Sequence, residues 1–304
     1  MKGNDSLANE IASLKIKKNA VILAHYYVEE EVQKIADYVG DSYYLSQKAV
    51  ETKAQIIVFA GVRFMGESAK LLNPDKKVLM PDEKADCAMA HMITVAEIEK
   101  MREKYDDLAV VCYINSTAEI KQHSDICVTS SNAVQIVRNM KEKNLFFIPD
   151  RNLGSYVAAR VPDKNVILNE GYCPVHEKIT VSMIQHKKNR LPEALLIAHP
   201  ECRKEVLELA DFVGSTSELI EFVGRNPAKQ FLVATETGVF YQMQKQNPDK
   251  LFYSVREDQI CHDMKRITRK KILEVLENET NEILLDPSFI EGAVKPLERM
   301  LGRF

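Results

Sequence analysis

Three of the six cysteines recur at a nearly constant spacing. Cys87 lies 86 residues before Cys173, and Cys261 lies 88 residues after it, each behind a short apolar run and a turn. Three thiolates that converge without a fourth suit an iron–sulfur cluster of four irons with one iron left open to substrate. Three thiolates and a water could instead hold zinc. No Cys-x-x-Cys occurs, which excludes zinc-ribbon and thioredoxin-like sites.

Other polar residues recur with the same spacing. His25, Tyr113 and His199 each close a short aliphatic run, and they lie 88 and 86 residues apart. Hydroxyl residues keep these offsets further along the chain, at Ser42, Ser130 and Thr216. A true internal repeat must carry more than its cysteines, and this one does. We therefore interpret the chain as one structural unit used three times.

Strand-like and helix-like patterns alternate within each unit. In the first unit, aliphatic runs at 21–24, 56–59 and 78–80 indicate buried strands, and helical periodicity covers 28–39, 42–49 and 64–72. In the second unit, strands are expected at 109–113, 126–128, 146–148 and 166–168. Such alternation is typical of a parallel sheet covered by helices on both faces.

The repeat and the alternation together predict the architecture. We expect an α/β fold of three pseudo-threefold-related, three-layer αβα units, each with a mainly parallel four-stranded sheet, around a central cavity. The units are expected at residues 1–84, 85–171 and 172–264, with helices in 265–304 packing on the body.

Polar residues at the carboxyl ends of parallel strands converge on a crevice. The three strand-end residues and the three recurring cysteines should therefore face one central cavity. Ser42, Ser130 and the pair Ser215–Thr216 are expected to begin helices, where hydroxyls and free backbone N–H groups suit a carboxylate or phosphate. Ser215 has a second explanation, since Glu218 completes a capping box with it.

Composition narrows the class of protein. The chain has 304 residues, 45% of them hydrophobic, a net charge of −3 and a pI near 6.2. No basic block interleaves with aromatics, so nucleic acid is not expected as a partner. No apolar segment approaches the roughly 18 residues that span a bilayer, and Met1–Asp5 does not lead into a signal-peptide core. We expect a cytoplasmic protein without membrane contact.

The remaining cysteines have simpler explanations. Cys112 and Cys127 fall inside apolar strand-like runs and are expected to be small buried hydrophobes. Cys202 is given no ligand role. Six scattered cysteines do not form a disulfide scaffold in a reducing compartment.

Ordered motifs between residues 20 and 265 carry a resemblance to a known family. They are Ala24-His25-Tyr26-Tyr27, Gly40-Asp41-Ser42, Tyr113-Ile114-Asn115-Ser116-Thr117, Pro149-Asp150-Arg151-Asn152-Leu153-Gly154, Cys173-Pro174-Val175-His176 and His199-Pro200-Glu201-Cys202. Together they resemble the quinolinate synthase (quinolinate synthetase A) family. The resemblance implies condensation of iminoaspartate with dihydroxyacetone phosphate to quinolinate, with release of phosphate and water, in NAD biosynthesis. It also implies a functional link to an L-aspartate oxidase or dehydrogenase.

The resemblance assigns roles to individual residues. It implies a [4Fe-4S] cluster on Cys87, Cys173 and Cys261, with one open iron. It places around the substrate His25, Ser42, Tyr113, Asn115, Ser130, His199, Glu201 and Thr216, and Tyr27 and Ser215 match family positions that line the same cavity.

The chemistry of the open iron and of the cavity side chains suggests which step of the reaction each assists. The reaction forms carbon–carbon and carbon–nitrogen bonds and removes phosphate and water without net redox change, so an open iron is useful as a Lewis acid. We hypothesise that Glu201 and Tyr27 move protons, while His25 and His199 orient and neutralise oxyanions. The alternatives are another three-unit iron–sulfur enzyme, such as a hydroxymethylbutenyl diphosphate reductase or a diphthamide-type radical enzyme, and a non-catalytic iron–sulfur metabolite sensor.

Overall fold

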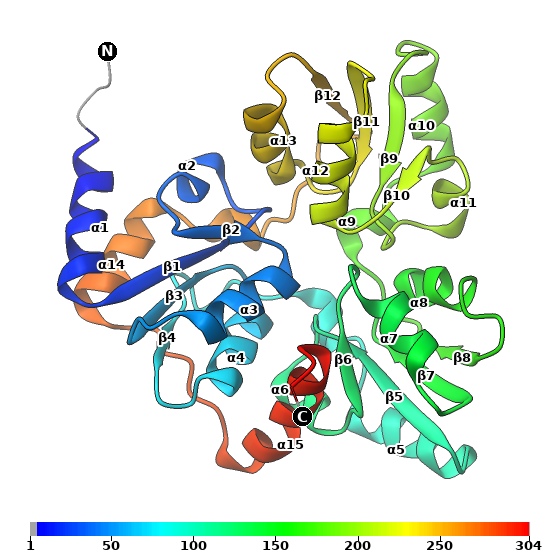
Figure 1. Ribbon diagram of the computed structural model, residues 1–304, viewed down its shortest axis with the longest axis horizontal. Helices are drawn as coiled ribbons and strands as arrows, with labels where there is room; N and C mark the ends of the chain where they lie inside the picture. The colour runs from blue at the N-terminus through cyan, green and yellow to red at the C-terminus, as the bar shows by residue number, and fades with distance from the viewer. Residues whose placement is uncertain (1–4, 304) are drawn as a thin grey trace.

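Three separate four-stranded sheets make up the computed structural model, which describes residues 5–303 (Figure 1). The first has the order β2 (Tyr38–Gly40), β1 (Ala20–His25), β3 (Ile56–Ala60), β4 (Lys77–Leu79). The second has β6 (Ile126–Val128), β5 (Leu108–Tyr113), β7 (Asn144–Ile148), β8 (Asn165–Leu168). The third has β10 (Phe212–Val213), β9 (Leu195–Ala198), β11 (Gln230–Ala234), β12 (Leu251–Ser254). All neighbouring strands within these sheets are parallel, which confirms the predicted α/β fold.

Helices separate the strands and cover the sheets. Around the first sheet lie α1 (Ser6–Lys17), α2 (Glu30–Gln33), α3 (Ser42–Glu51) and α4 (Arg63–Leu72); around the second, η1 (Ala88–His91), α5 (Val95–Lys104), α6 (Ala118–Gln122), α7 (Ala133–Asn139) and α8 (Arg151–Ala158). The third carries α9 (Pro174–Glu177), α10 (Val181–Lys188), α11 (Lys204–Leu207), α12 (Thr216–Arg225), η2 (Thr237–Val239) and α13 (Phe240–Gln246), and the chain closes with η3 (Met264–Arg266), α14 (Arg269–Asn278) and α15 (Pro287–Met300). The predicted capping box at Ser215–Glu218 is present, and another is found at Thr94–Glu97.

The internal repeat extends to individual hydrogen bonds. An aspartate before the second strand of each sheet accepts the backbone N–H of a residue in the first strand: Asp37 from Ile22 at 2.8 Å, Asp125 from Val110 at 2.7 Å and Asp211 from Leu196 at 2.7 Å. A lysine in the Pro-Asp-Lys turn before the fourth strand of each sheet donates to the carbonyl of the residue that caps the C-terminus of the helix before the third strand: Lys76 to Thr52 after α3, Lys164 to Met140 after α7 and Lys250 to Asn226 after α12. These recurring contacts fix the same chain path three times.

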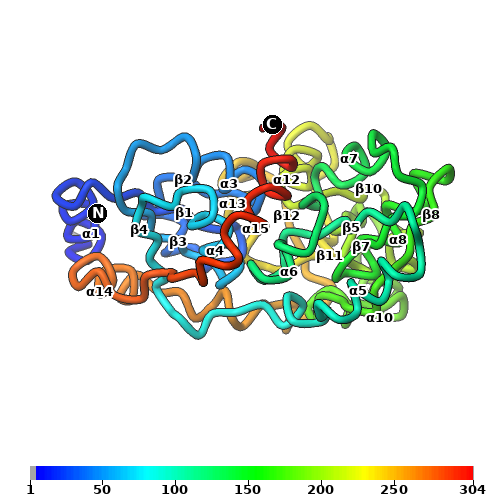
Figure 2. Tube along the Cα trace, turned by 90° about the horizontal axis from the view of Figure 1, so that it is seen from below, coloured from blue at the N-terminus to red at the C-terminus, as the bar shows by residue number. Residues whose placement is uncertain are grey.

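The C-terminal segment ties the first sheet to the second. After α14, which lies beside α1, the chain pairs with the edge of β4 through Ile283 N–H and Val78 C=O at 2.8 Å. It then crosses to α15, which packs on α6 and β6 (Figure 2). Glu279 and Asn281 adopt φ values of 51° and 58° on the way, a left-handed turn that brings the chain alongside β4.

Several sequence expectations need comment. The helical periodicity at 28–39 is wrong for most of its length, because only α2 is helical and Val39 lies in β2, paired with Ala24 of β1. The unit boundaries at 1–84, 85–171 and 172–264 stay a prediction, although each range holds one sheet. Met1–Asn4, on which the signal-peptide expectation depends, lie outside the described residues. Within residues 5–303 no helix has the length and apolar character needed to cross a membrane.

Candidate active site

One cavity gathers residues from the carboxyl ends of all three sheets. Twelve of the predicted site residues line it: His25, Tyr27, Ser42, Cys87, Tyr113, Asn115, Ser130, Cys173, His199, Glu201, Thr216 and Cys261. His25 ends β1, Tyr113 ends β5 and His199 directly follows β9, so equivalent positions of the repeat meet in space. The strand-end argument correctly placed these side chains together.

The two strand-end histidines are held in the same way. The backbone N–H of Tyr27 donates to His25 Nδ1 at 3.1 Å, and that of Glu201 donates to His199 Nδ1 at 3.3 Å. His199 Nδ1 also lies 3.7 Å from a Glu201 carboxylate oxygen, which is too long for a hydrogen bond, so we assign this nitrogen as an acceptor. Burial lowers the pKa of both rings to about 3 despite the Glu201 charge. Both are therefore neutral at pH 7 and carry their proton on Nε2.

Glu201 is a buried carboxylate with two strong partners. The Tyr113 hydroxyl donates to one oxygen at 2.7 Å, and His176 Nδ1 lies 2.7 Å from the other. Burial alone would raise the pKa of Glu201, but His176, His199 and the Tyr113 hydroxyl together lower it to about 2. The carboxylate is therefore ionised at neutral pH.

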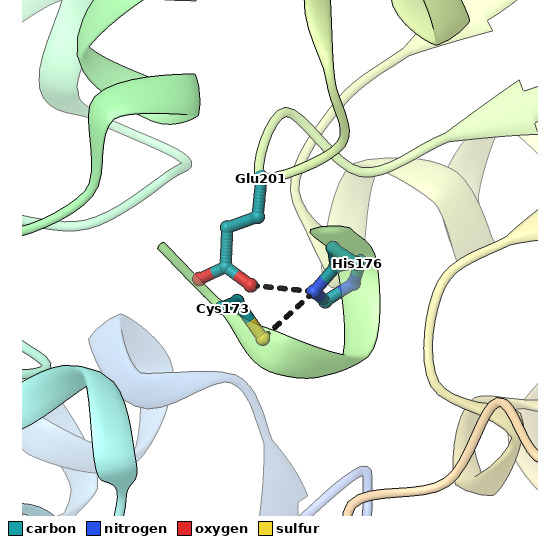
Figure 3. Close-up of side chains that lie close together, drawn as sticks. All are labelled: Cys173, His176 and Glu201. Carbon is teal, nitrogen blue, oxygen red and sulfur yellow. Dashed lines mark hydrogen bonds and ion pairs between the residues drawn. The ribbon is translucent and has the colours of Figure 1, made fainter. Parts of the chain in front are cut away.

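A hydroxyl–imidazole–carboxylate chain extends from Glu201. His176 places Nδ1 beside Glu201 and Cys173 Sγ (Figure 3), and its Nε2 lies 2.9 Å from Thr235 Oγ1. Thr235 Oγ1 in turn lies 2.9 Å from the Tyr27 hydroxyl. This is the connectivity of a nucleophile–base–acid triad, with a tyrosine added at its hydroxyl end. Burial, followed by the Glu201 charge, raises the pKa of Tyr27 well above its ordinary value, so Tyr27 keeps its proton.

The hydroxyl residues occupy different positions at their helices. Ser42 and Thr216 are the first residues of α3 and α12, but α7 begins only at Ala133, three residues after Ser130. Ser215 is the N-cap of α12: its hydroxyl accepts the Glu218 N–H, and it is not among the residues that line the cavity. The cavity-lining Asn115 has a buried side-chain oxygen without a hydrogen-bond partner.

The three recurring thiols are free and face the cavity. Burial raises the pKa of each, that of Cys261 to about 11, so bound metal must displace their protons. A tetrahedral zinc ion with bonds of about 2.3 Å would hold its sulfurs about 3.8 Å apart. Among the described residues the three thiols do not form a ligand set within 4.8 Å. This wider spread suits a cluster, in which each thiolate binds a different iron. Cys112 and Cys127 are fully buried and lie off the cavity, as expected for small hydrophobes, and Cys202 is also fully buried and off the cavity.

Sequence reasoning missed three buried residues of the site. His176 and Thr235 complete the triad described above. Glu236 lines the cavity, accepts the N–H of Cys261 at 3.2 Å and pairs with Lys265 at 3.1 Å. A partial signal existed for Glu236, because an acid follows the third strand of both the second and third sheets, at Asp150 and Glu236.

Comparisons with known proteins identify the family of the chain. A family model described as quinolinate synthetase A protein matches residues 9–302. Proteins named quinolinate synthase are similar over nearly their whole length: that of Fusobacterium nucleatum is 50% identical over 97% of this chain and 98% of its own, that of Caldicellulosiruptor saccharolyticus 48% over 98% of both, and that of Clostridioides difficile 45% over 97% of both. The chain therefore belongs to the quinolinate synthetase A family.

Proposed function

We propose that this enzyme condenses iminoaspartate with dihydroxyacetone phosphate to form quinolinate, releasing phosphate and water, for NAD biosynthesis. Family membership implies an iron–sulfur cofactor and small-molecule substrates. The observation that carries the proposal is the cavity itself, which combines three free thiols with a buried acid–base chain. Iminoaspartate carries an oxidised amine, so an enzyme that oxidises aspartate, an L-aspartate oxidase or dehydrogenase, must supply it.

The cofactor we propose is a [4Fe-4S] cluster held by Cys87, Cys173 and Cys261. When bound, it offers one iron without a protein ligand, a Lewis acid that polarises a substrate oxygen. All three thiols line one cavity and none is used in a disulfide.

Proton transfer falls to the chain that links Glu201 to Tyr27. Glu201 is ionised and can accept a proton through His176, while Tyr27 is protonated and can donate one through its hydroxyl. His176 and Thr235 join the two groups with contacts of 2.7 to 2.9 Å, so a proton lost at one end can be replaced from the other. This arrangement suits a reaction that must both remove protons from carbon and protonate a leaving hydroxyl.

Substrate binding falls to neutral donors around the cavity. His25 and His199 have Nδ1 occupied by a backbone N–H, which leaves Nε2–H to donate to a carboxylate or enolate oxygen. Ser42, Ser130 and Thr216 add hydroxyls for a carboxylate or for the departing phosphate, and Asn115 adds an amide. Ser215, proposed from the family pattern, would act by starting α12 beside Thr216.

The direct test is turnover by anaerobically reconstituted protein. We expect about four iron and four sulfide per chain, both lost in Cys173→Ala, together with matched formation of quinolinate and phosphate from the two substrates. Glu201→Gln should retain the cluster and lose about 100-fold or more in kcat. Near-normal turnover of this variant with an intact cluster would refute the role of Glu201. Binding of the acids without phosphate release would indicate a sensor.

A further inference from the structure

A compact set of three different donor atoms lies at the edge of the cavity. Cys173 Sγ, His176 Nδ1 and a Glu201 carboxylate oxygen all lie within 4.8 Å of one another, and among the residues from 5 to 303 they form the one such set of three metal-ligating groups (Figure 3). His176 and Glu201 are almost fully buried, with side-chain exposures of 1% and 5%. Only one of the three recurring cysteines belongs to this set.

We propose that the cluster-free chain binds a single divalent transition-metal ion at Cys173, His176 and Glu201. This site overlaps the three-thiol site at Cys173. It is nevertheless a different site, because it needs neither Cys87 nor Cys261. Its sulfur, imidazole nitrogen and carboxylate oxygen are the ligands that zinc and similar ions take in proteins. The proposal goes beyond the proposed reaction and does not depend on it.

The distances allow such an ion after small side-chain movements. His176 Nδ1 lies 3.1 Å from Cys173 Sγ and 2.7 Å from the Glu201 oxygen. A tetrahedral ion with ordinary bond lengths needs about 3.6 Å and about 3.3 Å between the same atoms. The three donors must therefore separate by roughly half an ångström. In the metal-free chain a proton on Nδ1 satisfies both neighbours, and the ion would replace it.

Neighbouring residues already orient the ligands from behind. Thr235 Oγ1 lies 2.9 Å from His176 Nε2 and can accept a hydrogen bond from that nitrogen once the ion replaces the proton on Nδ1, which leaves Nδ1 as the ligand atom. The Tyr113 hydroxyl donates a hydrogen bond of 2.7 Å to one Glu201 oxygen, so the other oxygen, which lies beside His176, remains available to bind metal. Partners of this kind fix the tautomer and the direction of metal ligands in proteins. The fourth coordination position would face the cavity, where water can fill it.

A metal ion bound at this site would inhibit the enzyme in two ways. It removes Cys173 from the three thiols that we assign to the cluster, and it removes His176 and Glu201 from the acid–base chain. A cluster-free chain loaded with zinc should therefore incorporate less iron on reconstitution, because the ion and the cluster compete for Cys173.

Cobalt(II) is the probe, because its absorption reports thiolate ligation and tetrahedral geometry. Reduced, cluster-free, full-length protein is titrated anaerobically with Co²⁺. We expect about one ion per chain with a thiolate-to-metal charge-transfer band. The double variant Cys87→Ser/Cys261→Ser should keep ion and band, and Cys173→Ser should lose the band. Thr235→Val should weaken binding by about 10- to 100-fold.

Controls separate ligation from misfolding. Cys127→Ala removes a buried cysteine outside the set and should leave the titration unchanged, and circular dichroism of each metal-free variant reports its fold. A band that persists in Cys173→Ser and disappears in the double variant would place the ion on the other thiols and overturn the proposal. Absence of any band in the folded wild-type chain would overturn it equally. Neither result affects the turnover test, which uses cluster-loaded enzyme.

Discussion

Neutral buried histidines make the folded chain sensitive to acid, and His25 allows a quantitative test. This residue is 5% exposed, and burial, opposed by the Glu201 charge, lowers its pKa from 6.5 to about 3. Between those values the unfolded chain binds a proton at this ring and the folded chain does not, so stability is lost as pH falls below 6.5. Lowering the pH from 7 to 5 should cost about 2 kcal/mol of unfolding free energy through His25 alone.

His25→Asn isolates this contribution. The asparagine oxygen can take the place of Nδ1 as acceptor for the Tyr27 N–H, but it does not titrate. Buried acids such as Asp150, whose pKa burial raises, shift stability with pH in the opposite direction, so the difference between the two proteins is the quantity to measure. Urea unfolding of reduced, cluster-free protein, followed by circular dichroism at pH 7, 6 and 5, gives that difference.

The expected result is that the stability of the wild type relative to His25→Asn falls by about 2 kcal/mol between pH 7 and pH 5. His186 is exposed on α10, and His186→Asn should show no such change. A constant difference for His25→Asn would mean that this ring titrates alike in the folded and unfolded chains. Burial would then not lower the pKa of His25, and the inference that the ring stays neutral from pH 7 to pH 5 would be refuted.

Three further predictions concern single contacts. Tyr113→Phe removes a charge-assisted hydrogen bond worth about 1.5–3 kcal/mol, so kcat should fall about 10- to 100-fold at unchanged iron content, and a change below twofold would contradict this. Ser215→Ala should cost about 1 kcal/mol in urea unfolding as a lost N-cap while leaving KM unchanged; a raised KM would instead indicate substrate contact. Lys265→Met leaves the fully buried Glu236 without its partner and should destabilise the chain by about 3–5 kcal/mol, with recovery in the double variant Lys265→Met/Glu236→Gln; equal instability of both variants would show that the charge pair is not the cause.

Strands were predictable where burial on both faces of the sheet requires an unbroken run of apolar residues. β5 and β7 are buried on both faces and read as unbroken apolar runs, so their positions followed from the sequence. β2 was missed, because Val28, Val32, Ile35 and Val39 have helical spacing. Pairing with β1 decides the structure there, since Asp37 fixes the chain by accepting the Ile22 N–H. Comparison with 126–128, the equivalent strand of the second unit, would have corrected the assignment.

The internal repeat identifies site residues that have counterparts in all three units. It cannot identify site residues that occur in one unit alone. The residues three places after each of the three recurring cysteines are Ala90, His176 and Met264, so His176 has no counterpart to reveal it. Thr235 corresponds to Gly61 and Pro149 and likewise has no counterpart of its own type. Both act through contacts with residues from other parts of the chain, His176 with Glu201 and Thr235 with Tyr27. Only the folded structure brings those partners together.

The position two residues after His25, Tyr113 and His199 shows how a symmetric scaffold acquires asymmetric chemistry. It holds Tyr27 in the first unit, Asn115 in the second and Glu201 in the third. All three line the same cavity, so the repeat delivers a phenol, an amide and a carboxylate from equivalent directions. Two different substrates must be bound in one orientation, with a proton donor at one end and a proton acceptor at the other. The scaffold therefore fixes where these side chains point, while the unequal demands of the reaction account for their different identities.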